Sequence, residues 1–240
     1  MNSTKKQARV AGLLYLLASM IGFFCLAYVP GKLIVSGDAT ATANRIRASE
    51  TLLRLGIASE LIAFTIFIFV VLALYRLFKA VSEKHAVAMA TLLLISIPIS
   101  LLNLLNEIAA LVLVSGASFL SAFEKGQLDA LAYMFLRLHG QGFIVAQIFW
   151  GLWLFPFGIL VIRSGFIPRF LGYLLFIAAS GYLASSFTSL LLPSYRHLVD
   201  QFAMVLEAGE LPIIFWLLIW GAKVPLDRPP LDPAIAQRNE

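Results

Sequence analysis

Residues 55–75 read LGIASELIAFTIFIFVVLALY, an almost unbroken apolar run whose one acidic side chain is Glu60. Because an α-helix rises about 1.5 Å per residue, such a run crosses a hydrocarbon core about 30 Å thick. Five further runs have the same character, and together the six predict an all-α, polytopic membrane protein, a bundle of six transmembrane helices. The predicted spans are 10–28, 55–75, 87–115, 143–162, 171–192 and 198–220.

The composition supports the same class and excludes others. Of the 240 residues, 60% are hydrophobic and 13% are charged, and the mean hydropathy is +0.90, far from the range of soluble domains. The net charge of +5 comes with Lys and Arg scattered among the ends of the spans, so no nucleic-acid partner is expected. Cys25, the single cysteine, lies inside the first span, which excludes a disulfide framework.

The distribution of positive charge predicts the orientation. Eleven of the 18 Lys and Arg residues fall on the side of the predicted bundle that holds both termini, and seven fall on the other side. By the positive-inside rule, both termini are expected in the cytoplasm. We therefore expect a six-helix transmembrane domain at 1–222 and a disordered, proline-rich cytoplasmic tail at 223–240.

The first outer loop contains signals for an additional helix. Turn formers at 28–31 predict the end of the first span, and Asp38 or Thr40 is placed to cap a helix that follows. The pattern at 43–54 is helical, and our main prediction is a short interfacial helix in this loop. A solvated extension of the second span is the alternative.

Other local signals concern contacts, loops and bends. Glu50 is spaced for an ion pair with Arg54 one helical turn later. A second exposed outer turn is expected at 119–132. Prolines within or beside three spans predict kinks there, namely Pro98, Pro156 and Pro212.

Polar side chains inside the spans gather on three helical faces at one depth, in the predicted extracytoplasmic half. Their spacings of three, four and seven residues place each set on one face of its helix. The sets are Ser96, Ser100, Asn103, Asn106 and Glu107 in the third span, Tyr182, Ser185, Ser186 and Ser189 in the fifth, and Asp200, Glu207 and Glu210 in the sixth. The cytoplasmic halves are almost wholly apolar, so we expect a shared polar pocket that opens outward.

The candidate ligand-binding residues are the ionisable and amide groups of this pocket. They are Arg54, Glu60, Asn103, Glu107, Arg137, His139, Gln141, Glu207 and Glu210. Arg54 and Arg137 are expected to hold an anionic group at the mouth, while Glu207 and Glu210 accept a proton or a cation deeper in the membrane. Helical geometry turns His139 about 160° away from Arg137, which directs it to a different neighbour.

Three interpretations of this cluster stay open. The first is a cavity that binds protons or a small or amphipathic, lipid-like ligand, and the second is a purely structural polar network in an accessory protein. The third is a membrane-embedded metal-dependent or acid-base enzyme. The chain has only 3 histidines and no HExxH or GxSxG motif, so no metal, catalytic residue or cofactor is assigned. The lipid bilayer is the expected partner, and the oligomeric state is not predicted.

Several motifs along the chain resemble those of a known family. They are RVAGLLYL at 9–16, GDATATANRI at 37–46, LLRLG at 52–56, LYRLFK at 74–79, SGFIPRFLGY at 164–173 and GELPIIFWLLIWG at 209–221. Together they resemble a bacterial family of multi-pass membrane proteins, domain of unknown function 4386. The resemblance implies a protein of the bacterial inner (plasma) membrane and supplies no established activity. Asp38, Thr42, Arg54 and Glu210 match the family pattern.

Overall fold

The computed structural model describes residues 3–222, so the tail predicted at 223–240 lies outside the described residues. Within residues 3–222, six helical segments are long and apolar enough to cross a membrane. They are Thr4–Leu33, Glu50–Phe78, Glu83–Val114, Lys125–Ser164, Arg169–Leu191 and Pro193–Ile219. This described part of the chain contains no strand. The predicted all-α class with six transmembrane helices is confirmed.

The first span combines three helical segments. These are α1 (Ser3–Phe23), the π-helical turn η1 (Phe24–Tyr28) and α2 (Val29–Leu33). The helix end predicted at 28–31 is wrong, because the helix continues through Pro30 to Leu33, directly after a π turn in which the Val29 N–H donates to the carbonyl oxygen of Phe24. The chain leaves the helix only at Ile34, which has extended backbone angles. The π turn, which contains Cys25, has no signal in the sequence, and such turns are frequent at functional sites.

A separate short helix occupies the first loop, as predicted. Helix α3 (Ala39–Ala48) begins at Asp38, whose side chain accepts a hydrogen bond from the backbone N–H of Ala41 over 2.8 Å. Ser49 leaves the helical conformation between α3 and α4 (Glu50–Phe78), so α3 is no extension of the second span. The predicted pair also forms, since Arg54 Nη2 lies 2.7 Å from Glu50 Oε1.

The third and fourth spans form a long hairpin. Helix α5 (Glu83–Val114) is followed by η2 (Ser118–Leu120) and α6 (Lys125–Leu152). The exposed turn predicted at 119–132 is too long, because a reciprocal capping box between Glu124 and Gln127 starts α6 at Lys125. Buried Asp129 forms an ion pair with Arg47 of α3, which keeps this part of α6 against the first loop.

The fourth and sixth spans are interrupted. After Trp153, the chain continues as α7 (Leu154–Ser164), then α8 (Arg169–Leu191) and η3 (Pro193–Tyr195). The sixth span is completed by α9 (Arg196–Glu207), η4 (Ala208–Glu210) and α10 (Leu211–Ile219). Pro156 and Pro212 stand in the first turns of α7 and α10, whereas Pro98 lies inside α5. Trp153 and Glu210, before these segments, keep right-handed helical backbone angles, so Pro156 and Pro212 lie beside local interruptions within continuous spans.

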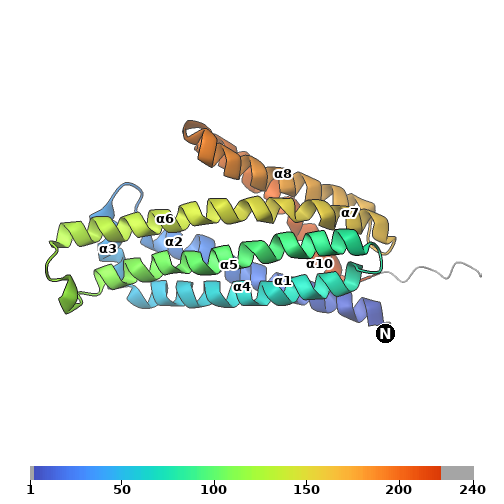
Figure 1. The fold of residues 1–240 in the computed structure, drawn as a ribbon, viewed down its shortest axis with the longest axis horizontal. Coiled ribbons are helices and arrows are strands. Elements are labelled where there is room, and N and C mark those ends of the chain that lie inside the picture. Colours follow the sequence, from blue (N-terminus) through green and yellow to red (C-terminus); the bar gives the residue numbers. More distant parts are fainter. Residues whose placement is uncertain (1–2, 223–240) are drawn as a thin grey trace, which may run out of the picture.

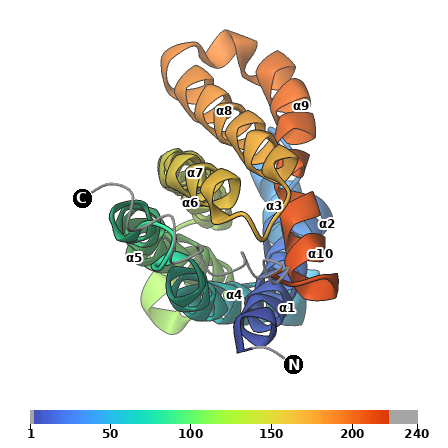
Figure 2. The same cartoon turned by 90° about the vertical axis from the view of Figure 1, so that its right-hand side faces the viewer.

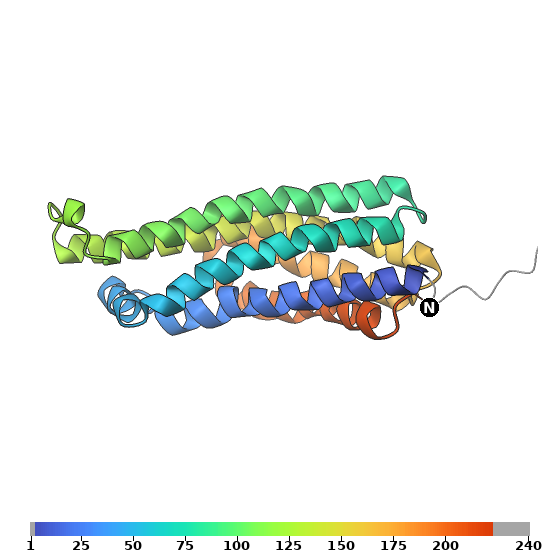
Figure 3. The same ribbon diagram turned by 90° about the horizontal axis from the view of Figure 1, so that it is seen from below.

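The helices run along one long axis (Figure 1). Both ends of the described chain meet at one end of the bundle, where Arg9 Nη2 donates to the carbonyl oxygen of Ile219 over 2.8 Å. We call this the terminal end, and we call the opposite end, where α3 lies, the loop end. The α5–α6 hairpin extends past α3 at the loop end (Figure 3). Helices α8 and α9 lean away from α4 and α5 (Figure 2).

Two separate groups of buried apolar side chains hold the bundle together. The terminal core joins all six spans and includes Tyr15, Val70, Leu74, Phe78, Met89, Phe157, Leu175, Ile213 and Leu217. The loop core joins only the first four spans and α3, and consists of Val29, Leu33, Ala43, Ile46, Leu53, Ala110, Leu111, Val114, Ala132 and Leu136. Between these two cores lies a layer of the bundle that contains buried polar side chains of the second, third and fourth spans.

Candidate functional site

Three ionisable side chains from three helices meet in this layer. Glu60 of α4, Glu107 of α5 and His139 of α6 are 0%, 3% and 6% exposed. His139 Nε2 lies 3.4 Å from Glu60 Oε2 and 3.7 Å from Glu107 Oε1. The ligand atoms of the three side chains all lie within 4.8 Å of one another, a separation that a metal ion could bridge. We call this group the triad.

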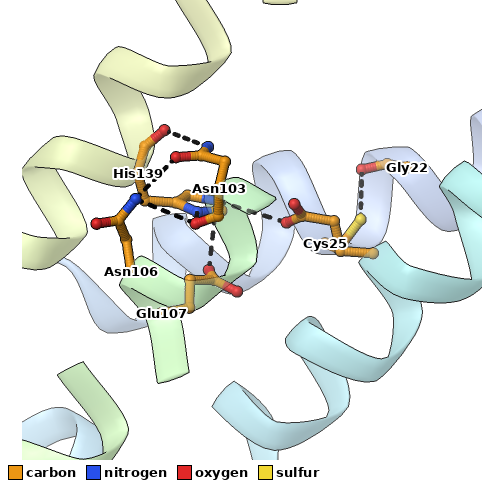
Figure 4. A network of polar contacts seen from close by, with 7 residues as sticks. Gly22, Cys25, Asn103, Asn106, Glu107 and His139 are labelled. Carbon is orange, nitrogen blue, oxygen red and sulfur yellow. Dashed lines mark hydrogen bonds and ion pairs between the residues drawn. The ribbon is translucent and has the colours of Figure 1, made fainter. Parts of the chain in front are cut away.

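Hydrogen bonds between α5 and α6 orient the histidine (Figure 4). His139 Nδ1 lies 3.2 Å from the carbonyl oxygen of Asn103, and the Asn103 amide nitrogen donates to the carbonyl oxygen of His139 over 2.8 Å. Asn106 donates in turn to Asn103 Oδ1 over 3.0 Å. Because a carbonyl oxygen only accepts, Nδ1 carries the proton, and Nε2 is directed at the two carboxyl groups.

The carboxyl groups are poorly satisfied within residues 3–222. Neither oxygen of Glu60 has a hydrogen-bond partner there, and Glu107 Oε2 has none either. A charged side chain at the middle of a membrane helix costs at least about 2.5–3.5 kcal/mol, so two carboxylates beside a neutral imidazole would be strongly unfavourable. The triad therefore needs protons or a cation to compensate its charge.

A second group of polar residues lines a cavity of about 460 Å³ near the middle of the bundle. Its walls are mainly aromatic and aliphatic, with side chains such as Tyr15, Phe64, Phe67, Trp150 and Trp153. The polar side chains of the lining include Gln147, Tyr182, Glu207 and Glu210. The Tyr182 hydroxyl donates to Glu210 Oε2 over 3.1 Å. The cavity thus combines a large apolar surface with two carboxyl groups.

The cavity reaches the lipid-facing surface of the bundle. Phe23 of α1 and Met204 of α9 line it and are 71% and 69% exposed. Leu211, at the start of α10, is a third lining residue with an exposed side chain. The exposed residues of the lining therefore come from the first and sixth spans.

The structure separates residues that the sequence placed in one pocket. The triad and Asn103 lie outside the cavity lining, and Glu207 and Glu210 belong to the cavity. Cys25 lines the cavity and also lies beside the triad network in Figure 4, where its thiol donates to the carbonyl oxygen of Gly22 over 3.4 Å. The π turn that contains Cys25 thus forms a wall between the two sites.

The predicted basic residues lie elsewhere. The Arg54 side chain is 60% exposed and paired with Glu50, and Arg137 is exposed. Gln141 is half-buried, and none of these three lines the cavity. His139 faces the opposite way from Arg137, in agreement with helical geometry. Neither arginine is therefore in position to hold an anionic group at the cavity.

Two polar contacts between helices differ from the sequence-based expectation. Asp200 accepts a hydrogen bond from Ser185 over 2.5 Å and pairs with Arg196 at 3.2 Å, so it does not join Glu207 in the cavity. The ion pair between Arg47 and Asp129 was missed, because residues 82 positions apart on different helices carry no local signal of contact.

Comparison with known proteins identifies a family. The family model described as Domain of unknown function (DUF4386) matches residues 10–221. An uncharacterized protein from Archaeoglobus fulgidus is 36% identical over 80 residues, which cover 33% of this chain and 46% of that protein. The matched stretch therefore spans less than half the length of that relative. No solved structure matches the chain.

Proposed function

This chain belongs to the family described as domain of unknown function 4386, and we propose that it binds an amphipathic small molecule in the cavity between its first and sixth spans. The apolar part of the ligand packs against the aromatic wall, and a cationic head group meets Glu207 and Glu210. One observation carries the proposal: a cavity of about 460 Å³ places two carboxyl groups in an otherwise mainly apolar wall that reaches the lipid-facing surface.

The size and lining of the cavity support a ligand of this kind. Small-molecule sites have volumes of about 300–1,000 Å³ and apolar walls with a few polar groups that fix orientation. Trp150 and Trp153 offer flat apolar faces, while Gln147 and the Tyr182–Glu210 hydrogen bond supply the polar part. A ligand with a long apolar portion and one polar end matches this arrangement of apolar and polar lining residues better than a free ion or a sugar.

The charges of the lining favour a cationic head. Among the described lining residues, two are acidic and none is Arg, Lys or His. In a medium of low dielectric constant, an anionic head beside Glu207 and Glu210 would be repelled, whereas an ammonium group would be attracted. The ligand class is therefore a primary or substituted amine with an alkyl or aromatic portion.

Access to the cavity follows from the proposed orientation. We place the protein in the plasma membrane with both termini in the cytoplasm, so that the loop end is extracytoplasmic. Helix α8 diverges from α6 toward that end (Figure 1). An amphipathic molecule in the extracytoplasmic half of the bilayer could then enter sideways, between Phe23 and Met204.

Binding of dodecylamine and dodecanoate tests the proposal, because the two probes share a chain length and differ in the sign of the head group. Isothermal titration of the purified protein in neutral detergent is expected to show tighter binding of dodecylamine. Charge-assisted hydrogen bonds are worth about 1.5–3 kcal/mol, so Glu210→Gln and Glu207→Gln should each weaken binding roughly 10- to 100-fold.

The matched control is Glu50→Gln, which removes a partly exposed carboxyl group on α4 outside the cavity. It should bind dodecylamine like the wild type. Equal affinity for both probes, or equal affinity of wild type and Glu210→Gln for dodecylamine, would reject the proposal in favour of a purely structural role for these carboxyl groups.

A further inference from the structure

We propose that the triad of Glu60, Glu107 and His139 binds one divalent transition-metal ion, for which Zn²⁺ is the best match. The three side chains come from α4, α5 and α6, and their ligand atoms lie within 4.8 Å of one another. None of the three lines the cavity, so this inference is independent of the proposed amine site. The sequence assigned no metal, because the chain has only 3 histidines and no HExxH motif.

The distances within the triad fit a metal site better than a hydrogen-bonded network. A hydrogen bond between a cationic nitrogen and a carboxylate has a length of about 2.7–2.9 Å. His139 Nε2 instead lies 3.4 Å from Glu60 Oε2 and 3.7 Å from Glu107 Oε1. Ligands held tetrahedrally at about 2.0–2.1 Å from a zinc ion are about 3.3–3.4 Å apart. The two nitrogen–oxygen separations of His139 are close to this value, and all three ligand atoms lie within 4.8 Å of one another.

The surroundings of His139 are those of a histidine ligand. Metal-bound histidines usually donate their other ring N–H to a carbonyl or carboxylate, which fixes the ring and leaves one nitrogen for the metal. Here Nδ1 faces the Asn103 carbonyl oxygen at 3.2 Å, and Nε2 faces the carboxyl groups. The side chain of Asn103 is itself held by Asn106 and lies against Gly142, where a side chain would overlap it.

The burial of the carboxyl groups is an independent indication of a ligand. Glu60 is 0% exposed, and within residues 3–222 neither of its oxygens has a hydrogen-bond partner. Glu107 Oε2 is also buried and has no hydrogen-bond partner within these residues. Two carboxylates and a neutral imidazole carry two negative charges, which one divalent ion neutralises. Apolar cores lie on both sides of the layer, so water cannot replace this compensation readily.

The donor set favours zinc over the abundant hard cations. Mg²⁺ prefers an octahedral shell of oxygens with several waters, and Ca²⁺ takes 6–8 oxygen ligands. The triad offers one imidazole nitrogen and two carboxyl groups in a closed apolar surrounding, which suits a four-coordinate ion with three protein ligands and one further position.

Metal analysis of the purified full-length protein tests this inference. After treatment with a chelator and dialysis against Zn²⁺, the wild type should retain about one zinc ion per chain. Co²⁺ in its place should give the intense visible absorption of a tetrahedral site. Glu107→Gln and His139→Ala should lose at least 10-fold in affinity, while Glu210→Gln, the matched control from the cavity, should bind Zn²⁺ like the wild type.

Thermal unfolding separates loss of the site from loss of the fold. Zn²⁺ should raise the unfolding temperature of the wild type and of Glu210→Gln, because it binds only the folded state, and should leave that of Glu107→Gln unchanged. If the folded wild type neither retains zinc nor is stabilised by it, the inference is overturned. It is also overturned if Glu107→Gln and His139→Ala remain folded and bind Zn²⁺ as tightly as the wild type.

Discussion

Replacement of Gly142 by alanine should disrupt the contact that orients the triad. In the structure, α6 presents Gly142 to the side chain of Asn103, and an added methyl group would overlap the Asn103 amide. Asn103 cannot retreat without giving up its 2.8 Å hydrogen bond to the carbonyl oxygen of His139. The substitution is therefore expected to push α5 and α6 apart and to remove a contact that fixes the position of His139.

The expected magnitude follows from these two effects. Overpacking of a well-packed site costs about 1–3 kcal/mol, and loss of one buried hydrogen bond adds about 0.5–1.5 kcal/mol. The gain from replacing a helical glycine by alanine is about 0.5–1 kcal/mol in the opposite direction. The net destabilisation should be about 1–3 kcal/mol, measured as a lower unfolding temperature in detergent, together with weaker Zn²⁺ binding.

Gly140→Ala is the matched control, because it changes the same residue type in the same helix two positions earlier. An added methyl group at Gly140 would meet nothing within 4 Å, so this variant should be as stable as the wild type or slightly more stable. If Gly142→Ala unfolds at the same temperature as Gly140→Ala, the close approach of α5 and α6 at Asn103 is refuted.

Three further predictions concern the fold. Asp129→Ala should destabilise the protein by about 2–3 kcal/mol, because it leaves Arg47 without its buried partner. Arg54→Gln removes only an exposed ion pair and should cost less than about 1 kcal/mol. Equal free energies of unfolding for the two variants in a denaturant titration would contradict this prediction. Gly12→Ala should lower the unfolding temperature, since its methyl group would lie 2.5 Å from the backbone nitrogen of Leu218. Gly22→Ala, whose methyl group would meet nothing within 4 Å, should unfold at the wild-type temperature. Equal unfolding temperatures of the two variants would contradict the close packing of α1 on α10. Reporter fusions at either terminus should be active only when the reporter functions in the cytoplasm, and activity of a periplasmic reporter would invert the orientation.

The spans could be predicted from the sequence because each depends on local composition. A run such as 55–75 is stable in the lipid bilayer regardless of which helices pack against it, so its hydropathy alone predicts the span. The cap at Asp38 and the Glu50–Arg54 pair are also local, since they join residues within one helical turn. The π turn at Phe24–Tyr28 has no local signal and was missed. The start of α6 at Lys125 has a local signal in the Glu124–Gln127 capping box, which the loop prediction overlooked.

The candidate site could be predicted only in part. The positions of Glu60, Glu107 and His139 relative to the predicted spans indicated a common depth, but they could not establish which side chains meet. That depends on how each helix is rotated and on its lateral neighbours, which the sequence of one chain does not specify. The same limit explains why Glu207 and Glu210, at a similar depth, lie in a separate cavity behind the turn that contains Cys25.

The central claim is that the buried polar groups form two sites, of which the triad holds a metal ion and the cavity does not. An anomalous difference map from crystals grown with Zn²⁺ tests this claim most directly. The account predicts one strong peak about 2.0–2.2 Å from His139 Nε2 and from an oxygen of each of Glu60 and Glu107. A map with no peak at the triad, or with its main peak between Glu207 and Glu210, would contradict it.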